Sequence, residues 1–374
     1  MTRGLHADYG AEFETRGGRT VVAHYGRPER THLAVRNGVG VIEMGYGVVV
    51  VEGGDAVDYV DNAVSNRVPD ADGEGCYALL LDPQGGIDTD LYVYNAGERL
   101  LCFTPPARAE PLAADWSDKV FIQDVSIRDA TDDFAVFGVH GPNATETLST
   151  LLAGATISEA PLTFVRGSIA DAGVTAVSTD DPTGETGYEV VCAADDAESV
   201  LDSLLTRGTP TTPVGYRTWE TLTLEAGTPL FETELDGRIP NVAGVRNALD
   251  FDKGCYVGQE VVSRVENRGR PSKRLVNLLL LPDADADSVV PDTGAAVLDG
   301  DASVGEVTRG AASPSLSGQP IALAYVDSDA YERDDPLDLD LDLGVRVDGD
   351  VVNAAFSDLP FVEGSGRSAR RPSY

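Results

Sequence analysis

The chain has 374 residues, with 28 lysines and arginines against 62 aspartates and glutamates, and its formal net charge is -34 at pH 7. Because 42% of the residues are hydrophobic and only 24% are charged, the chain can bury a core and is not an acidic disordered protein. Its length predicts two or three domains, since single cores rarely grow beyond about 250–300 residues. The acidity argues against broad nucleic-acid binding, which needs cations that face phosphates.

Lysine is nearly absent, since Lys119, Lys253 and Lys273 are the only three. An acidic excess with so little lysine indicates a salt-rich cytosol, where negative charge keeps the surface hydrated and salt screens the self-repulsion. No apolar run approaches the roughly 20 residues of a membrane helix. The first 15 residues contain no apolar stretch typical of a signal peptide. We therefore expect a soluble, cytoplasmic protein of a halophile.

The cysteines and histidines do not predict a metal site. Cys76, Cys102, Cys192 and Cys255 lie far apart without a C-x-x-C pair, and the four histidines show no metal-binding spacing. A disulfide scaffold is implausible in a cytosolic chain of this length.

The first two-thirds of the chain alternates strand-like and helix-like segments. The stretch from Val39 to Val51 contains a β-branched run that is typical of a buried strand, and Gly53-Gly54-Asp55 ends it as a turn. We expect Asp55 to cap a helix, a second helix to follow Gly141-Pro142-Asn143, and a third to run from Ala194 to Leu205. This alternation predicts an α+β fold.

From Lys273 onward the pattern changes to short strand-like segments separated by turns. The predicted strands cover Leu275 to Leu281, Val304 to Thr308, Ile321 to Val326 and Leu337 to Leu343. Short strands at regular spacing favour a small barrel or sandwich. In the last segment Asp338, Asp340 and Asp342 alternate with leucines, which indicates a solvated strand face more than a calcium site. The residues after Glu363 have no apolar face and are expected to be disordered.

A basic segment stands out in this acidic chain. Between residues 251 and 274 there are six cations and only three anions, Asp252, Glu260 and Glu266, which gives a net charge of +3. One interpretation is that its arginines pair with the acidic surface around them. The other is an anion site, where cations and glycine N–H groups receive a carboxylate or a phosphate. Both remain open.

Cys255 lies two residues after Lys253 in a turn-like, glycine-containing context. A neighbouring cation favours the thiolate form, which is the reactive one. No histidine adjoins it in sequence, so a Cys-His nucleophile cannot be argued, and a buried cysteine is the structural alternative.

The motif K-G-C-Y-V-G-Q-E, from Lys253 to Glu260, resembles the signature of YgfZ-type folate-binding proteins. These form the iron–sulfur cluster assembly and tRNA-modification branch of the glycine-cleavage T-protein superfamily. Similarity to the wider superfamily extends along nearly the whole chain, from His32 to Val362. The matching segments are residues 53–56, 85–91, 141–144, 183–189, 222–227, 305–308, 313–314 and 321–326.

The resemblance implies a compact fold with a central folate cavity and tetrahydrofolate or a derivative as the cofactor. The fold class that it implies is an α+β, T-protein-like folate-binding fold with a C-terminal small β-barrel. Residues 1–270 would form the folate-binding region of two α+β subdomains, residues 271–362 the barrel, and residues 363–374 a disordered tail.

The resemblance also implies site residues. Glu225 matches the glutamate that holds the pterin, and a carboxylate can accept two parallel N–H donors from a pterin edge. Tyr188 lies in the segment T-G-E-T-G-Y-E, which lines the folate pocket in the family. Cys255 and Lys253 are the catalytic candidates of the motif. The residues of this region that are expected to contact the cofactor are Lys253, Gly254, Gly258, Gln259 and Arg264.

One departure weakens a transferase function. Aminomethyltransferases of this superfamily carry an N-A-x-x-x-x-K-D stretch, whose aspartate assists methylene transfer from a lipoyl-bound aminomethyl group to tetrahydrofolate. Here the stretch from Phe103 to Arg108 reads F-T-P-P-A-R, and the next aspartate, Asp115, lies too far along the chain. Proton transfer requires a group within hydrogen-bond reach of the reacting atoms.

Three functions therefore stay open. The first is a folate-binding accessory protein that supports iron–sulfur enzymes or tRNA modification, with an iron–sulfur enzyme as partner and any tRNA contact indirect. The second is an aminomethyltransferase of glycine cleavage or a related one-carbon transferase, and the third is a folate-binding regulator without chemistry. In the first, the single thiol of Cys255 supplies at most one cluster ligand, so the isolated protein should hold no stable cluster.

Overall fold

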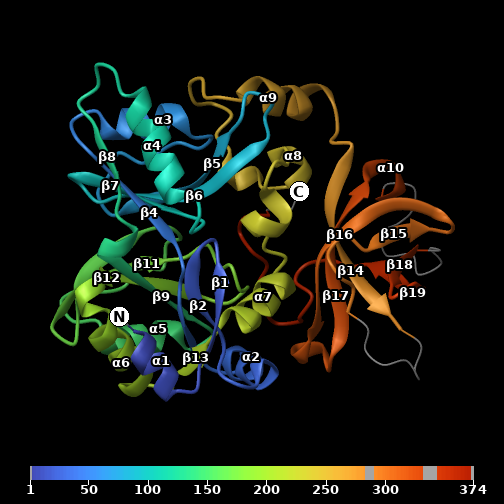
Figure 1. Ribbon diagram of the computed structural model, residues 1–374, viewed down its shortest axis with the longest axis horizontal. Helices are drawn as coiled ribbons and strands as arrows, with labels where there is room; N and C mark the ends of the chain where they lie inside the picture. The colour runs from blue at the N-terminus through green and yellow to red at the C-terminus, as the bar shows by residue number, and fades with distance from the viewer. Residues whose placement is uncertain (1, 283–289, 332–342, 372–374) are drawn as a thin grey trace.

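The computed structural model describes residues 2–282, 290–331 and 343–371, which form two packed sheets and a separate barrel (Figure 1). The two sheets lie face to face, and helices cover the outer face of each. The barrel lies to one side of this sandwich. In the part of the chain that the structure describes, no helix has the length and apolarity to span a membrane.

The first sheet has five strands in the order β5-β6-β7-β4-β8. Helices α3 (Ala56–Ala63) and α4 (Ala109–Lys119) pack on its outer face through a core that includes Val49, Val51 and Trp116. The strands are β4 (Gly47–Glu52), β5 (Glu74–Leu81), β6 (Ile87–Asn95), β7 (Arg99–Thr104) and β8 (Ser126–Asp129).

The second sheet has six strands in the order β10-β11-β12-β9-β3-β13, and all neighbours are antiparallel except β13 and β3. Helices α5 (Ala144–Leu151) and α6 (Ala197–Thr206) cover its outer face. The strands are β3 (Gly40–Glu43), β9 (Phe134–His140), β10 (Phe164–Ile169), β11 (Ala172–Ser178), β12 (Gly187–Ala193) and β13 (Thr212–Val214).

The inner faces of the two sheets share one core. Val48 and Val50 of β4 enter it, whereas Val49 and Val51 face the outer helices, because successive strand residues point to opposite faces. Both faces of β4 are thus buried, which explains its run of valines. The predicted buried strand within residues 39–51 is confirmed as β4, and the start of that stretch forms a separate strand, β3, of the other sheet.

Shorter elements surround this sandwich and lead from it to the barrel. The N-terminal part contains α1 (Arg3–Asp8), the hairpin of β1 (Glu12–Arg16) and β2 (Arg19–His24), and α2 (Pro28–Arg36). The connection to the barrel contains α7 (Tyr216–Glu225), the π-helical turn η3 (Phe231–Leu235), α8 (Pro240–Ala243) and α9 (Gln259–Arg268). Short 3-10 turns are η1 (Thr131–Asp133), η2 (Ala194–Asp196), η4 (Arg246–Ala248) and η5 (Pro314–Leu316).

The expected barrel is confirmed as a closed sheet of six strands in the order β14-β17-β16-β15-β18-β19. Its strands are β14 (Lys273–Leu281), β15 (Ala296–Asp299), β16 (Ala302–Ser313), β17 (Gln319–Asp327), β18 (Leu343–Val347) and β19 (Asp350–Phe356), and α10 (Ser328–Tyr331) follows β17. Residues 337–342 of the predicted aspartate-leucine strand lie outside the described residues, and Leu343 begins β18.

Two local expectations were wrong. Asp55 precedes α3, but its side chain makes no cap hydrogen bond to that helix, and its Oδ2 accepts the N–H of Asp124 instead, at 2.8 Å. The C-terminal tail, expected to be disordered after Glu363, is ordered through residue 371. Ser368 N–H donates to Ala226 O at 3.0 Å, and Arg370 is only 7% exposed. A tail without an apolar face is held here by hydrogen bonds and a buried cation, which hydrophobic patterning cannot detect.

Candidate functional site

A central pocket opens between the two sheets, next to the β1–β2 hairpin, α7 and the C-terminal tail. Aromatic and apolar side chains form most of its walls, with a few charged groups among them. The lining residues include Met44, Tyr46, Asp90, Tyr92, Phe103, Tyr216, Trp219, Phe231 and Arg370.

The rings of this central pocket lie against one another as flat walls. Tyr46 and Phe103 are stacked with ring centres 5.7 Å apart and planes inclined by 10°. The Tyr216 hydroxyl accepts the N–H of Gly45 at 2.8 Å, which fixes the link between β3 and β4 against α7. Fixed parallel rings of this kind suit a planar aromatic ligand.

Three carboxylates lie buried beside the central pocket, and each receives a tyrosine hydroxyl. Tyr77 donates to Asp90 at 2.9 Å, Tyr92 to Asp180 at 2.7 Å, and Tyr46 to Glu189 at 2.7 Å. Asp90, Asp180 and Glu189 are at most 7% exposed. Burial raises the pKa of Asp90, and it raises the pKa of Glu189 to about 7. Glu189 can therefore hold or release a proton near neutral pH.

Arg370 of the tail supplies the cation for these acids. Its guanidinium lies over the rings of Tyr77 and Tyr92, with Cζ 4.4 and 5.2 Å from their centres, and donates to the Tyr92 hydroxyl at 2.6 Å. It also lies 3.5 Å from one carboxylate oxygen of Asp90 and 3.5 Å from one of Asp180. The tail therefore completes the charge balance of the central pocket.

One carboxylate oxygen of Glu189 is unpaired in the part of the chain that the structure describes. Its Oε1 accepts the Tyr46 hydroxyl, but its Oε2 is buried and has no hydrogen-bond partner among the described residues. Glu189 does not itself line the central pocket but lies behind Tyr46, which does. An unpaired buried carboxylate oxygen is costly, so a ligand donor that reached it would be favoured.

The structure places Glu225 outside the central pocket with a full set of internal partners. Its carboxylate is 0% exposed and accepts from Arg36 at 2.7 and 3.0 Å and from Ser313 at 2.5 Å, with His32 Nε2 at 2.9 Å. Burial acts to raise the pKa of Glu225, but the hydrogen bond from His32 and the charge of Arg36 hold it below its ordinary value. These contacts tie α7 to α2 and to the barrel.

Lys253 is likewise remote from the lining of the central pocket. Its side chain is 1% exposed, and Nζ donates to the carbonyls of Asp61, Val64 and Asn66 at 2.5, 3.0 and 2.7 Å, and to Asp61 Oδ1 at 3.1 Å. These acceptors lie at the C-terminal end of α3, where a cation also complements the helix dipole. The geometry favours a structural role.

Replacing Lys253 with Met is expected to lower the free energy of unfolding by about 3 kcal/mol, because three carbonyls would be left buried without a donor. Ligand affinity of the folded protein should stay within about twofold of wild type, which calorimetry would measure beside urea denaturation. Lys119→Met is the matched control, since Lys119 is 66% exposed in an i,i+4 pair with Asp115 and should contribute less than about 1 kcal/mol. If folded Lys253→Met lost its affinity for the ligand, Lys253 would belong to the binding site as the sequence predicts.

Tyr188 points away from the central pocket. Its side chain is buried in the core under α5 and α6, and its hydroxyl lies 2.9 Å from Thr145 Oγ1. The next residue, Glu189, points to the opposite face of β12, as strand alternation requires. The segment 183–189 does contact a wall of the site, but through Glu189, whose Oε1 accepts the hydroxyl of the lining residue Tyr46.

The rest of the K-G-C-Y-V-G-Q-E motif forms an exposed loop before α9. Cys255 is exposed, which rules out the buried alternative. Gly258 has φ +81°, and a Cβ there would lie 2.7 Å from the carbonyl oxygen of Asp82, so this glycine permits close packing against another turn. Gly254 and Gln259 do not line the central pocket.

The basic segment around this loop pairs with acids. Arg264 donates to Glu260 at 2.5 Å on the surface of α9, and Arg270 donates to Asp329 at 2.6 Å. Together with the Lys253 contacts, these pairs favour the interpretation that the segment matches its acidic surroundings. The catalytic role of Cys255 and the role of Arg264 in cofactor binding stay predictions.

Three site residues were missed by the sequence analysis: Asp90, Glu189 and Arg370. Asp90 and Glu189 lie inside matching segments, at residues 85–91 and 183–189, so strand alternation could have identified them. Arg370 carried no detectable signal. The segment from Phe103 to Arg108, which lacks the aspartate of the aminomethyltransferase stretch, does face the central pocket. It lines this pocket through Thr104, Pro105 and Pro106.

Comparison with known families identifies two matching models. The GCVT N-terminal domain matches residues 3–253, and the glycine cleavage T-protein C-terminal barrel domain matches residues 273–362. Together they cover both the sandwich and the barrel, in agreement with the fold class expected from the sequence.

Similar proteins include aminomethyltransferases from two bacteria. That of Saccharopolyspora erythraea is 32% identical over 360 residues, covering 94% of this chain and 96% of its own. That of Bacillus subtilis is 28% identical over 343 residues, covering 90% and 93%. The crystal structure of glycine cleavage system aminomethyltransferase T from Bartonella henselae has a TM-score of 0.83 at 22% identity, covering 97% and 98%, which demonstrates the same fold.

Proposed function

Since the chain belongs to the glycine cleavage T-protein family, we propose that it is a one-carbon transferase that uses tetrahydrofolate in the central pocket. The observation that carries the proposal is the unpaired, buried Oε2 of Glu189 beside a pocket walled by flat aromatic rings. The family supports the aminomethyltransferase function more directly than the YgfZ-type function, because the similar proteins carry that name.

The residues present fit a folate. The stacked rings of Tyr46 and Phe103 would hold a planar pterin, and Glu189 would accept the N–H donors of its edge. Two cations, Arg16 and Arg370, line the same pocket, and both already pair with carboxylates of the chain. When bound, tetrahydrofolate supplies nitrogens that carry the one-carbon unit.

Asp90 offers the proton handling that the missing aspartate would otherwise supply. It lies two residues before Tyr92 on the same face of β6, and Tyr92 pairs with Phe103, so Asp90 adjoins the segment of Thr104 and Pro105. Burial raises the pKa of Asp90, which favours the protonated form required of an acid. Asp90 would take up and release this proton at its carboxylate, beside Arg370 and the Tyr77 hydroxyl.

A second candidate is the YgfZ-type accessory function, with an iron–sulfur enzyme as partner. The observation that favours it is the exposure of Cys255 in a loop of the matching motif, where a partner could reach the thiol. The absence of the transferase aspartate points the same way. The indirect contact with tRNA that belongs to this candidate function stays a prediction. The origin of the chain in a salt-rich cytosol also stays a prediction.

A single variant separates the two candidates. We expect the wild type and Cys255→Ser to bind tetrahydrofolate equally in calorimetry and to form methylene-tetrahydrofolate at equal rates from a lipoyl-bound aminomethyl donor. Ser keeps the size of the side chain and removes the thiolate. Folate binding without any transfer in either protein, together with loss of iron–sulfur enzyme activity in cells that carry Cys255→Ser, would favour the accessory function. Absence of folate binding would reject both.

A further inference from the structure

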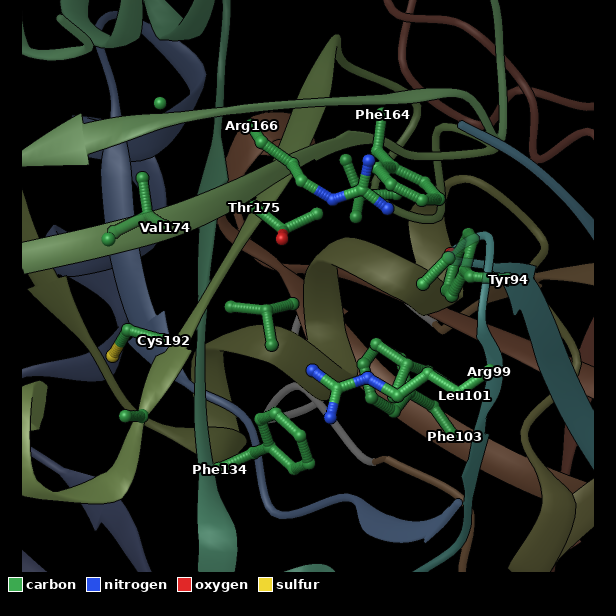
Figure 2. A pocket seen from close by; sticks show the side chains of 16 residues that line it. Tyr94, Arg99, Leu101, Phe103, Phe134, Phe164, Arg166, Val174, Thr175 and Cys192 are labelled. Carbon is green, nitrogen blue, oxygen red and sulfur yellow. The ribbon is translucent and has the colours of Figure 1, made fainter. Parts of the chain in front are cut away.

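A second cavity lies between the two sheets (Figure 2), and Phe103 lines both this cavity and the central pocket. It is bounded by the β6–β7 turn on one side and by strands β10, β11 and β12 on the other. Its volume is about 360 Å³, compared with about 150 Å³ for the central pocket. The volume of this second cavity is within the range of small-molecule sites in proteins.

Two arginine–phenylalanine pairs face each other across this cavity. The guanidinium carbon of Arg99 lies 5.8 Å from the ring centre of Phe134, and that of Arg166 lies 5.1 Å from the ring centre of Phe164. Figure 2 shows the two arginines reaching in from opposite walls, with the Thr175 hydroxyl between them. The cavity therefore combines flat surfaces on two sides with polar groups in the middle.

The two arginines differ in their charge balance. Arg166 donates to both carboxylate oxygens of Asp72, at 2.7 and 2.9 Å. Arg99 is half-buried, yet no carboxylate of residues 2–282, 290–331 or 343–371 forms an ion pair with it, in a chain with a net charge of -34. A guanidinium recognises carboxylates through its fixed planar array of donors. Arg99 is thus the one cation of the cavity that is available to a ligand.

We propose that this cavity binds a flat aromatic monocarboxylate, with its carboxylate on Arg99 and its ring between Phe134 and Phe164. One available cation matches one negative charge, and a dianion would leave a charge uncompensated in a half-buried site. The floor of Leu101, Val177 and Val191 suits an apolar ring edge. The Thr175 hydroxyl can donate to or accept from a ring substituent. This proposal is independent of the folate site.

The test is a fluorescence titration of the full chain with salicylate at fixed ionic strength. Wild type should show saturable binding to one site, and Arg99→Gln should bind about tenfold or more weakly, because a charge-assisted hydrogen bond is lost. Arg207→Gln is the matched control, since Arg207 is exposed and follows α6 on the opposite face of the sheet. Phe134→Leu should also weaken binding, through loss of the ring surface, and circular dichroism checks that each variant folds.

The same titration with two analogues tests charge and shape separately. Salicylamide, which is neutral, should bind much more weakly than salicylate, and cyclohexanecarboxylate, which is not flat, should compete poorly. The proposal is overturned by a wild type without saturable binding, by Arg99→Gln binding as tightly as wild type, or by cyclohexanecarboxylate competing as well as salicylate. Binding that survives in Arg99→Gln would assign salicylate to another site.

Discussion

Replacing Arg370 with Met is expected to lower the free energy of unfolding at pH 8 by about 3–5 kcal/mol, because Asp90 and Asp180 would remain buried without their cation. Tetrahydrofolate binding should be lost with it, since Arg370 also lines the central pocket. Urea denaturation at constant salt measures the first effect, and calorimetry measures the second.

The cost of Arg370→Met should shrink as the pH falls. Burial already raises the pKa of Asp90, and loss of the guanidinium removes the charge that opposes this rise. A carboxyl whose pKa is higher in the folded state binds more protons there, so the folded state gains stability toward acid. Unfolding of the variant at pH 5 should therefore be closer to wild type than at pH 8.

Two controls accompany Arg370→Met. Adding Asp90→Asn to it should recover part of the lost stability, because one buried charge is removed. Arg346→Met, at an exposed position of β18, should change stability by less than about 0.5 kcal/mol. An Arg370→Met protein as stable as wild type from pH 5 to pH 8 would show that the tail does not hold the site together.

Glu189→Gln is expected to separate stability from binding. At pH 8 the variant should be more stable than wild type by about 3 kcal/mol, because the pKa of Glu189 is raised from 4.5 to about 7 by burial, and ionising it costs stability. Gln can still accept the Tyr46 hydroxyl. Tetrahydrofolate affinity should fall about tenfold or more, since a charged acceptor for the pterin donors is lost.

The raised pKa of Glu189 also predicts how the stability of the wild type changes with pH. Wild-type stability should decline as the pH rises from about 4.5 to about 7, where folded Glu189 keeps its proton and the unfolded chain has lost it. Glu189→Gln should lack this decline, whereas Glu198→Gln, at an exposed position of α6, should keep it. Unchanged affinity in Glu189→Gln would remove this residue from the proposed site.

Much of the fold could be predicted from patterns that depend on local chemistry. The barrel strands around Leu275–Leu281 and Ile321–Val326 were evident as apolar runs, and the helix after Gly141-Pro142-Asn143 is present as α5. The split of residues 39–51 into β3 and β4 was not evident, because both strands are buried on two faces and only the short link around Gly45 separates them.

The site was harder to predict, because resemblance assigns a motif and not the direction of each side chain. Tyr188 and Glu189 occupy the same matching segment, yet only the face of β12 decides which one reaches the centre. Lys253 was predicted to be catalytic, but its ammonium group donates to carbonyls at the C-terminal end of α3. Arg370 contacts residues that lie far from it in sequence, so no local pattern predicts its place in the site.

The pairing of β3 between β9 and β13 of the six-stranded sheet affects how the chain folds. Gly40 pairs with His140 and with Thr212, which lie about 100 and about 170 residues further along, whereas all strands of the five-stranded sheet fall within residues 47–129. Closing long loops slows folding. The five-stranded sheet should therefore form first and expose its inner valines until β9 and β13 arrive, an order that pulse-labelled amide exchange during refolding would reveal. In that interval the chain is most exposed to aggregation.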